Sequence, residues 1–225
     1  MTLLLFLTLA TPTGMGVEIE PIHHGSLVLK YQDKVIHGDP WSRGNYDGVA
    51  KADLVLITDI HSDHMDPNQI QEVTKPGTII IAPEAVQKTV ANAQVLRNGE
   101  TTELLGIRIE AISMYNLNRG PGPGKLYHIK GRGNGYLLTL GQERVYISGD
   151  TECVPEIRAL KNVDIAFICI NLPYTMPPQE AASCVNSFAP KVVYPYHHRG
   201  SELGEFKRGV TAAGTEVRIL DWYGK

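Results

Sequence analysis

The sequence predicts an α/β domain in which helices cover two β-sheets, and three observations support this fold class. Strand-like segments recur at short intervals and are separated by clusters of Gly, Pro and Asn. Two short apolar runs, Asp53–Thr58 and Thr78–Ala82, are continuous rather than alternating, which is typical of strands buried on both faces. The segments follow the order β-rich, α, β-rich, α, β with no internal linker. We therefore expect one domain over residues 17–225.

The first half of the chain predicts an antiparallel meander, followed by helices that alternate with the two apolar strands. The meander consists of three strands, Val17–Ile22, Ser26–Tyr31 and Lys34–His37, with a tight turn at Gln32-Asp33. A helix is expected between the apolar runs, at Asp66–Val73. A second helix is expected at Pro83–Ala93, because proline is favoured at the start of a helix.

The second half predicts a hairpin, two helices and further strands. Two strands are expected within residues 102–113, and the hairpin pairs Gly135–Leu140 with Arg144–Ser148. The expected helices are Pro155–Lys161 and Pro178–Phe188. The remaining expected strands are Asp164–Ile170, Lys191–Tyr194 and Glu216–Leu220. These segments complete the α/β pattern.

The composition excludes several classes of protein. Of the 225 residues, 43% are hydrophobic and 20% are charged, which excludes a disordered chain, a collagen-like fibre and a coiled coil. The formal net charge is −3, so no basic excess indicates a nucleic-acid partner. Cys153, Cys169 and Cys184 are odd in number and have no CxxC spacing, which argues against a disulfide framework and a cysteine zinc ribbon. We interpret Cys153 as a packing residue rather than a nucleophile.

Residues 1–16 form a separate question, because Leu3–Ala10 is apolar throughout. This run is shorter than the roughly 20 residues that a membrane span needs, so we expect no stable membrane insertion. It resembles the apolar part of a secretory signal, but no Lys or Arg precedes Lys30. The segment is thus either signal-like or a first strand, and the compartment stays open between cytoplasm and export.

The strongest chemical signal is the segment Asp59–His64 (DIHSDH), directly after the apolar run DLVLIT. Imidazole and carboxylate groups together suit Zn(II), Mn(II) or Fe(II) better than Ca(II) or Mg(II). Burying so many titratable groups at the end of a strand is unfavourable without a cation to offset their repulsion. The segment therefore predicts a metal site.

Three further segments carry candidate ligands. Asp150 follows Gly149 at the end of a predicted strand, where glycine permits an unusual backbone angle or a close approach. His197 follows the strand that ends in Tyr194, and His128 lies in a loop rich in Gly and basic residues. Each of these residues alone is weak evidence for a metal site, and they support a metal site only in combination.

Together these motifs resemble the metallo-β-lactamase superfamily, and within it the compact metal-dependent hydrolases akin to the ascorbate-6-phosphate lactonase group. The resemblance covers nearly the whole chain, from His23-His24-Gly25-Ser26 to the YPYHH segment that ends at His198. It implies an αββα sandwich of two mixed β-sheets flanked by helices, with metal ions in a cleft at the edge between the sheets. It assigns His61 and His128 to a first metal, Asp63, His64 and His197 to a second, and Asp150 to a bridge between them.

Asp59 departs from the family pattern, since the family motif H-x-H-x-D-H reads D-x-H-x-D-H here. A carboxylate can still ligate, and we expect Asp59 to bind the first metal directly. Its extra negative charge would then favour Mn(II), Fe(II) or Mg(II) over Zn(II) at that site. The alternative is that Asp59 turns away and only the second site is filled.

A binuclear site predicts hydrolysis by a metal-activated water. Two divalent ions, Zn(II) or Mn(II) first and Fe(II) or Mg(II) next, would lower the pKa of water and polarise the substrate. Asp63 would orient the attacking water while it holds the second ion, and Asp150 would join both ions.

The substrate is expected to be a small molecule with an ester bond, either a phosphodiester or a lactone. If His128 binds metal, then Arg119, Lys125, Lys130 and Arg132 approach the cleft. Such a basic rim would favour phosphate or carboxylate groups of a substrate. Alternatively, these charges only keep the loop soluble. The expected substrate-binding residues are Asn116, Arg119, Lys130, Arg132 and His24.

Two other functions stay open. One is a β-lactamase or a promiscuous relative, and the other is a non-catalytic metal-binding protein that retains the fold. Asp59 is the main argument for the latter, because one altered ligand can empty a metal site. A homo-oligomer is compatible with the sequence.

Overall fold

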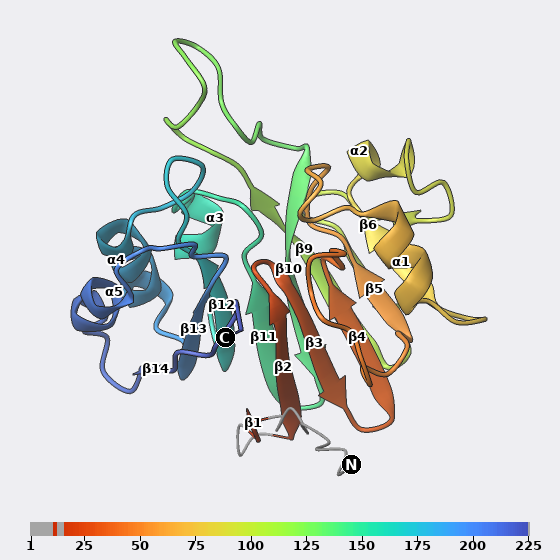
Figure 1. Cartoon of the computed structure of the whole chain (residues 1–225). Coiled ribbons are helices and arrows are strands. Elements are labelled where there is room, and N and C mark those ends of the chain that lie inside the picture. Colours follow the sequence, from red (N-terminus) through yellow and green to blue (C-terminus); the bar gives the residue numbers. More distant parts are fainter. Residues whose placement is uncertain (1–10, 13–15, 225) are drawn as a thin grey trace, which may run out of the picture.

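The computed structural model describes residues 11–12 and 16–224. Within these residues the chain forms two seven-stranded sheets that pack face to face, with helices on their outer sides (Figure 1). This arrangement confirms the expected sandwich of two mixed sheets flanked by helices. Most of the segment 1–16, including the apolar run Leu3–Ala10, lies outside the described residues.

The first sheet begins with antiparallel strands and continues with parallel ones. Its strands, in spatial order, are β1 (Thr11–Pro12), β2 (Val17–His23), β3 (Ser26–Tyr31), β4 (Lys34–Gly38), β5 (Leu54–Leu56), β6 (Ile79–Ala82) and β7 (Gln94–Val95). Pairing is antiparallel up to β4 and parallel from β4 to β7. The predicted meander is confirmed, including the turn that places Tyr31 opposite Lys34.

The second sheet repeats this plan. Its strands, in chain order, are β8 (Thr101–Leu104), β9 (Ile107–Met114), β10 (Gly133–Leu140), β11 (Glu143–Ile147), β12 (Ile165–Cys169), β13 (Val192–Tyr196) and β14 (Glu216–Val217). Pairing is antiparallel from β8 to β11 and parallel from β11 to β14. The two sheets therefore share one layout, a meander followed by parallel strands.

Helices cover the outer side of each sheet. Beside the first sheet lie α1 (Pro67–Val73) and α2 (Glu84–Gln87), and beside the second lie α3 (Pro155–Arg158), α4 (Pro178–Phe188) and α5 (Leu203–Gly209) (Figure 1). The four predicted helices are present, although α2 and α3 are shorter than expected. No helix among the described residues reaches the length and apolarity that crossing a membrane requires.

The strand β5 is buried on both faces, as its apolar sequence predicts. Leu54 and Leu56 pack in the large core that lies between the sheets. Val55 packs in a second core, with Ile70 and Val73 of α1. Burying one such side chain contributes about 1.5–3 kcal/mol, so this strand is fixed firmly at the point where the DIHSDH segment begins.

One sequence-based interpretation is wrong. Cys153 is not a plain packing residue, because it forms a disulfide with Cys184 of α4. The pairing joins the segment after β11 to the helix that covers it, and the two Cα atoms lie 5.6 Å apart. An odd number of cysteines excludes complete pairing but not a single bridge, and Cys169 is left as a buried free thiol.

Candidate metal centre

Most of the candidate ligands lie where strands end. The antiparallel and parallel pairings make β2, β4 and β5 run in one direction, and they do the same for β9, β11 and β13. Carboxyl ends of strands that run the same way meet at one edge of a sheet. His24, the segment 59–64, Asp150 and His197 follow such ends, and His128 lies in the long loop that joins β9 to β10. Residues far apart in the sequence are thereby brought to the same edge of the sandwich.

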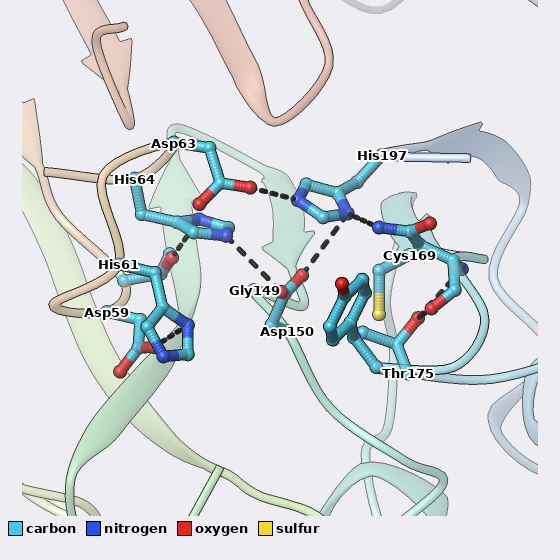
Figure 2. A network of polar contacts seen from close by, with 12 residues as sticks. Asp59, His61, Asp63, His64, Gly149, Asp150, Cys169, Thr175 and His197 are labelled. Carbon is cyan, nitrogen blue, oxygen red and sulfur yellow. Dashed lines mark hydrogen bonds and ion pairs between the residues drawn. The ribbon is translucent and has the colours of Figure 1, made fainter. Parts of the chain in front are cut away.

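Asp150 is the residue on which this cluster converges (Figure 2). Its Oδ2 atom lies 3.4 Å from Nε2 of His64 and 3.4 Å from Nε2 of His128. Its Oδ1 atom lies 3.4 Å from Nδ1 of His197. Each carboxylate oxygen of Asp150 therefore faces at least one histidine ring nitrogen, as expected of the bridging residue that the resemblance implies.

Gly149 allows the chain to place Asp150 there. Its φ of 60° lies in the left-handed region, and a Cβ atom would collide with the sulfur of Met114. Glycine is therefore needed at this position because side chains of the protein itself, such as that of Met114, pack closely against its backbone.

Three histidines have their Nδ1 atoms directed at oxygen acceptors. Nδ1 of His64 lies 2.8 Å from Asp39 Oδ2, and Nδ1 of His128 lies 2.7 Å from Asn116 Oδ1. Nδ1 of His61 lies 2.9 Å from Asp59 Oδ2. A histidine that donates its Nδ1 proton presents the lone pair of Nε2, which is the usual arrangement of metal-binding histidines.

Asp63 lies between the rings of His24 and His197. Its Oδ2 atom is 3.4 Å from Nε2 of His197 and 3.6 Å from Nε2 of His24. Nδ1 of His24 is 2.7 Å from the hydroxyl of Tyr223. His24 and His197 both adopt left-handed backbone conformations, with φ of 55° and 49°. Such strain costs a non-glycine residue about 1–2 kcal/mol and is concentrated at functional sites.

The charges in the cluster favour a bound cation. Burial opposes ionisation, but the neighbouring histidines, His197 first, hold the pKa of Asp150 well below its usual value. Burial would likewise lower the pKa of His64, yet the facing carboxylates, Asp150 first, raise it well above its usual value. In the absence of a metal, a proton on His64 supplies positive charge to the carboxylates. A divalent ion would replace that proton.

The unsatisfied atoms fit a metal ion as well. Nε2 of His64, Nε2 of His128 and Oδ1 of Asp150 are buried and have no hydrogen-bond partner among the described residues. Buried polar atoms without a partner are rare, and a bound ion would satisfy these three. In the part of the chain that the structure describes, three sets have ligand atoms within 4.8 Å of one another: His24, Asp63 and His197; Asp59, His61 and His128; and His64, Asp150 and His197.

Asp59 also pairs with Arg132, which is not one of the candidate ligands. Nε and Nη2 of Arg132 lie 3.0 and 2.8 Å from its two oxygens. Burial opposes ionisation, but hydrogen bonds from His61 and Arg132 lower the pKa of Asp59 to about 2. Asp59 is therefore an ionised carboxylate paired with a guanidinium group.

A cavity of about 340 Å³ opens onto the cluster. Apart from candidate ligands, it is lined by two tyrosines, Tyr127 and Tyr174, whose rings meet edge to face at 4.9 Å. Its lining also includes Arg199 and Asn171. The cavity is large enough for a small molecule and brings it against His61, Asp63 and Asp150.

Most of the expected substrate-binding residues do not line this cavity. Of them, His24 lines the cavity, but Asn116, Arg119, Lys130 and Arg132 do not. The basic groups are engaged by acidic side chains. Nη2 of Arg119 lies 2.8 Å from Glu180, and Nζ of Lys130 lies 2.7 Å from Glu156.

Asn116 is also occupied. Its Oδ1 atom faces His128 and its amide group donates to Glu152 at 3.1 Å. These ion pairs give no support to a basic rim at the cleft, which stays a prediction. Glu152, which follows β11, Glu156 of α3 and Glu180 of α4 pair with Arg119 and Lys130.

Several residues at the site escaped sequence reasoning. Arg199, Tyr174 and Asn171 have side chains of types common on any surface, so composition and spacing gave no signal for them. Arg199 lies two residues beyond His197, and that spacing alone could have suggested it. The roles of Asp39 and Tyr223 depend on contacts between distant strands and the chain end, which no local motif encodes.

Comparisons with known proteins agree with this geometry. Residues 18–197 match the beta-lactamase superfamily domain. A UPF0173 metal-dependent hydrolase of Thermococcus onnurineus is 31% identical over 81% of this chain and 87% of its own length. A proposed metal-dependent hydrolase of Parabacteroides distasonis, known as a crystal structure, is 45% identical with a TM-score of 0.85, over 90% of this chain and 92% of that one. Igni18, a metallo hydrolase of Ignicoccus hospitalis, shares the fold at 24% identity, with a TM-score of 0.73 over 91% of this chain and 95% of that one.

Proposed function

The chain belongs to the beta-lactamase superfamily, and within it to the UPF0173 metal-dependent hydrolases, and from that premise we propose that it hydrolyses an ester bond in a small molecule. It is a metal-dependent hydrolase. The proposal adds a binuclear centre and a substrate class, a lactone or a phosphodiester. The family relationship also removes the support for a non-catalytic binding protein.

The observation that carries the proposal is the position of Asp150. One carboxylate has His64 and His128 on one oxygen and His197 on the other, and all four residues are buried. In the proposed centre, His61 and His128 would hold one ion, Asp63, His64 and His197 would hold the other, and Asp150 would serve both. A divalent ion held there would lower the pKa of water and polarise the oxygen of an ester.

The chain's own residues then orient the reactants. Asp39 and Asn116 fix the rings of His64 and His128, so that their Nε2 atoms face Asp150. Asp63 lies on the wall of the cavity and is ionised at neutral pH. Although burial opposes this, the charge of His64 and hydrogen bonds from His197 and His24 hold its pKa far below the usual value. The Asp63 carboxylate is therefore placed to accept a proton from the attacking water.

The cavity supports a substrate with an anionic group and an apolar part. Arg199 is exposed and lines the cavity, and among the described residues no carboxylate forms an ion pair with it. Tyr127 and Tyr174 offer an aromatic wall beside it. A guanidinium group binds carboxylate or phosphate in a fork-like geometry, which suits a substrate with one such group away from the scissile bond.

The test combines metal analysis with turnover. The purified protein is stripped with a chelator, reloaded with Zn(II) or Mn(II), and assayed on a chromogenic phosphodiester, a lactone and a cephalosporin. We expect metal-dependent turnover of the phosphodiester or the lactone that Asp150→Ala abolishes. Asp33→Ala, at an exposed position in the turn after β3, serves as the control. Two bound ions with no turnover on any ester, or turnover of the cephalosporin alone, would contradict the proposed substrate class.

A further inference from the structure

Asp59 lies where the expected direct metal ligand should be, yet its oxygens are already engaged. Arg132 donates to both oxygens, and Nδ1 of His61 lies 2.9 Å from Oδ2. Asp59 is fully buried at the end of β5, and Arg132 is largely buried just before β10. The two oxygens of a carboxylate offer about four acceptor positions, and the two-pronged guanidinium pair together with the His61 ring takes three of them.

The contact between Asp59 and His61 has two counterparts in the same cluster. Asp39 accepts from His64, and Asn116 accepts from His128, in both cases at Nδ1. In each pair the oxygen acceptor leaves Nε2 for the metal. Asp59 thus contacts Nδ1 of His61 in the same way that Asp39 contacts Nδ1 of His64. Partners of this kind fix the orientation of a metal-binding ring.

The charge of Asp59 has its own counter-ion. An aspartate in place of a neutral imidazole would add one negative charge to the first site, whereas the Asp59–Arg132 pair adds none. The pair therefore resembles the histidine of the family motif in net charge. Breaking a buried ion pair by removing one partner is strongly unfavourable, because the other charge is left uncompensated.

We propose that Asp59 is a positioning residue that orients His61, with its charge cancelled by Arg132, and that it is not itself a metal ligand. Direct ligation is the competing arrangement, since Asp59 Oδ2 also lies 3.9 Å from Nε2 of His128. The inference rests on the metal centre of the proposed function and is independent of the substrate.

A double-mutant cycle on metal affinity separates the two arrangements. Asp59→Asn keeps an oxygen for His61 but leaves the charge of Arg132 unpaired beside the first ion. We expect Zn(II) and Mn(II) to bind the first site about 10- to 100-fold more weakly in this variant, the range typical of lost outer-sphere partners. Arg132→Gln alone should not weaken binding, because it frees a carboxylate beside the ion. The double variant Asp59→Asn/Arg132→Gln should regain most of the lost affinity.

The same cycle can overturn the proposal. If Asp59 is a ligand, the double variant regains only the affinity lost to the unpaired charge of Arg132 and stays well below the wild-type protein, because removing Arg132 cannot restore a missing ligand. The matched control is Glu84→Gln/Arg97→Gln, which removes an exposed ion pair of 3.1 Å away from the cluster and should leave metal affinity unchanged. Affinities are measured by competition with a chromophoric chelator. A wild-type protein that binds no ion would refute the proposed function itself, which separates the two failures.

A measurement on the wild-type protein covers the case in which a variant does not fold. A crystal structure of the zinc-loaded protein with anomalous scattering at the metal edge should show Arg132 still paired with Asp59. No oxygen of Asp59 should then lie within about 2.0–2.2 Å of an ion, the zinc–carboxylate distance. An Asp59 oxygen at that distance would overturn the proposal.

Discussion

The carboxylate of Asp39 lies 2.8 Å from Nδ1 of His64, although the two residues are 25 positions apart in the sequence. Asp39 directly follows β4 and is fully buried, and it also accepts from the backbone N–H of Thr58 at 2.7 Å. No candidate metal ligand follows β4, but Asp39, which follows this strand, orients His64, which follows the neighbouring strand β5. His64 depends on this contact to present Nε2 to Asp150.

We predict that Asp39→Asn weakens metal binding at the site of His64 by about 10- to 100-fold, because the acceptor that orients the ring becomes uncharged and can rotate its amide. Asp33→Asn, at an exposed turn, should leave the affinity unchanged. Chelator competition with Zn(II) measures both variants. Unchanged affinity in Asp39→Asn would show that ring packing alone orients His64.

Metal stoichiometry should distinguish the residues that serve one ion from the residue that serves both. We predict that His128→Ala and Asp63→Ala each lose one equivalent of metal, and that Asp150→Ala loses both. The reason is that Asp150 contacts His64 and His128 with one oxygen and His197 with the other. Elemental analysis after gel filtration gives the counts. Retention of one full equivalent in Asp150→Ala would contradict a bridging role.

The sequence predicted the fold well where pattern and packing agree. Asp53–Thr58 was readable as a buried strand because both of its faces are apolar, and Leu54 and Val55 indeed pack in different cores. The helix α5 was missed because only Phe206 is buried on it, so its apolar periodicity is weak. The clustering of Asp63, His128, Asp150 and His197 was accessible only through the resemblance, because strands far apart in the chain bring these residues together.

Pairing of charged side chains could not be predicted in the same way. Arg119, Lys130 and Arg132 were expected at the cleft because they flank His128, but an acidic partner in another segment binds each of them. The partners lie between 26 and 73 positions away along the chain. Local sequence shows how many charges a loop carries. Only the fold decides which of them remain free to meet a substrate.

The disulfide between Cys153 and Cys184 should contribute measurably to stability. It closes a loop of 31 residues, for which loss of unfolded-chain entropy predicts about 3–4 kcal/mol. We predict that Cys184→Ser lowers the free energy of unfolding by up to this amount in urea titrations. Reductant should destabilise the wild-type protein similarly and leave the variant unaffected.

Thiol titration checks the same pairing directly. Without reductant, the denatured wild-type protein should show a single reactive thiol, that of Cys169. Three reactive thiols in protein purified under oxidising conditions would contradict the disulfide.

The stability of the metal-free protein should fall on mild acidification because of His24. Burial lowers its pKa from 6.5 to about 4, although Asp63 opposes the shift. The unfolded chain therefore binds this proton at higher pH than the folded protein, so the His24 contribution is complete above pH 6.5 and is lost as the pH falls towards 4. In His24→Gln, urea titrations between these pH values should show a shallower decline. An equal slope in both proteins would assign the decline to other groups.

The position of Arg199 in the cavity wall leads to a prediction about substrate binding. Its guanidinium group is the cationic side chain that lines the cavity without an acidic partner among the described residues. If it binds an anionic group remote from the reacting bond, it contributes to substrate binding and not specifically to the transition state. We predict that Arg199→Met raises KM for an anionic ester with little change in kcat, and leaves both constants unchanged for a neutral ester of the same size. Arg208→Met, on α5, is the matched control. An equal rise in KM for both esters would indicate that Arg199 shapes the cavity and does not recognise charge.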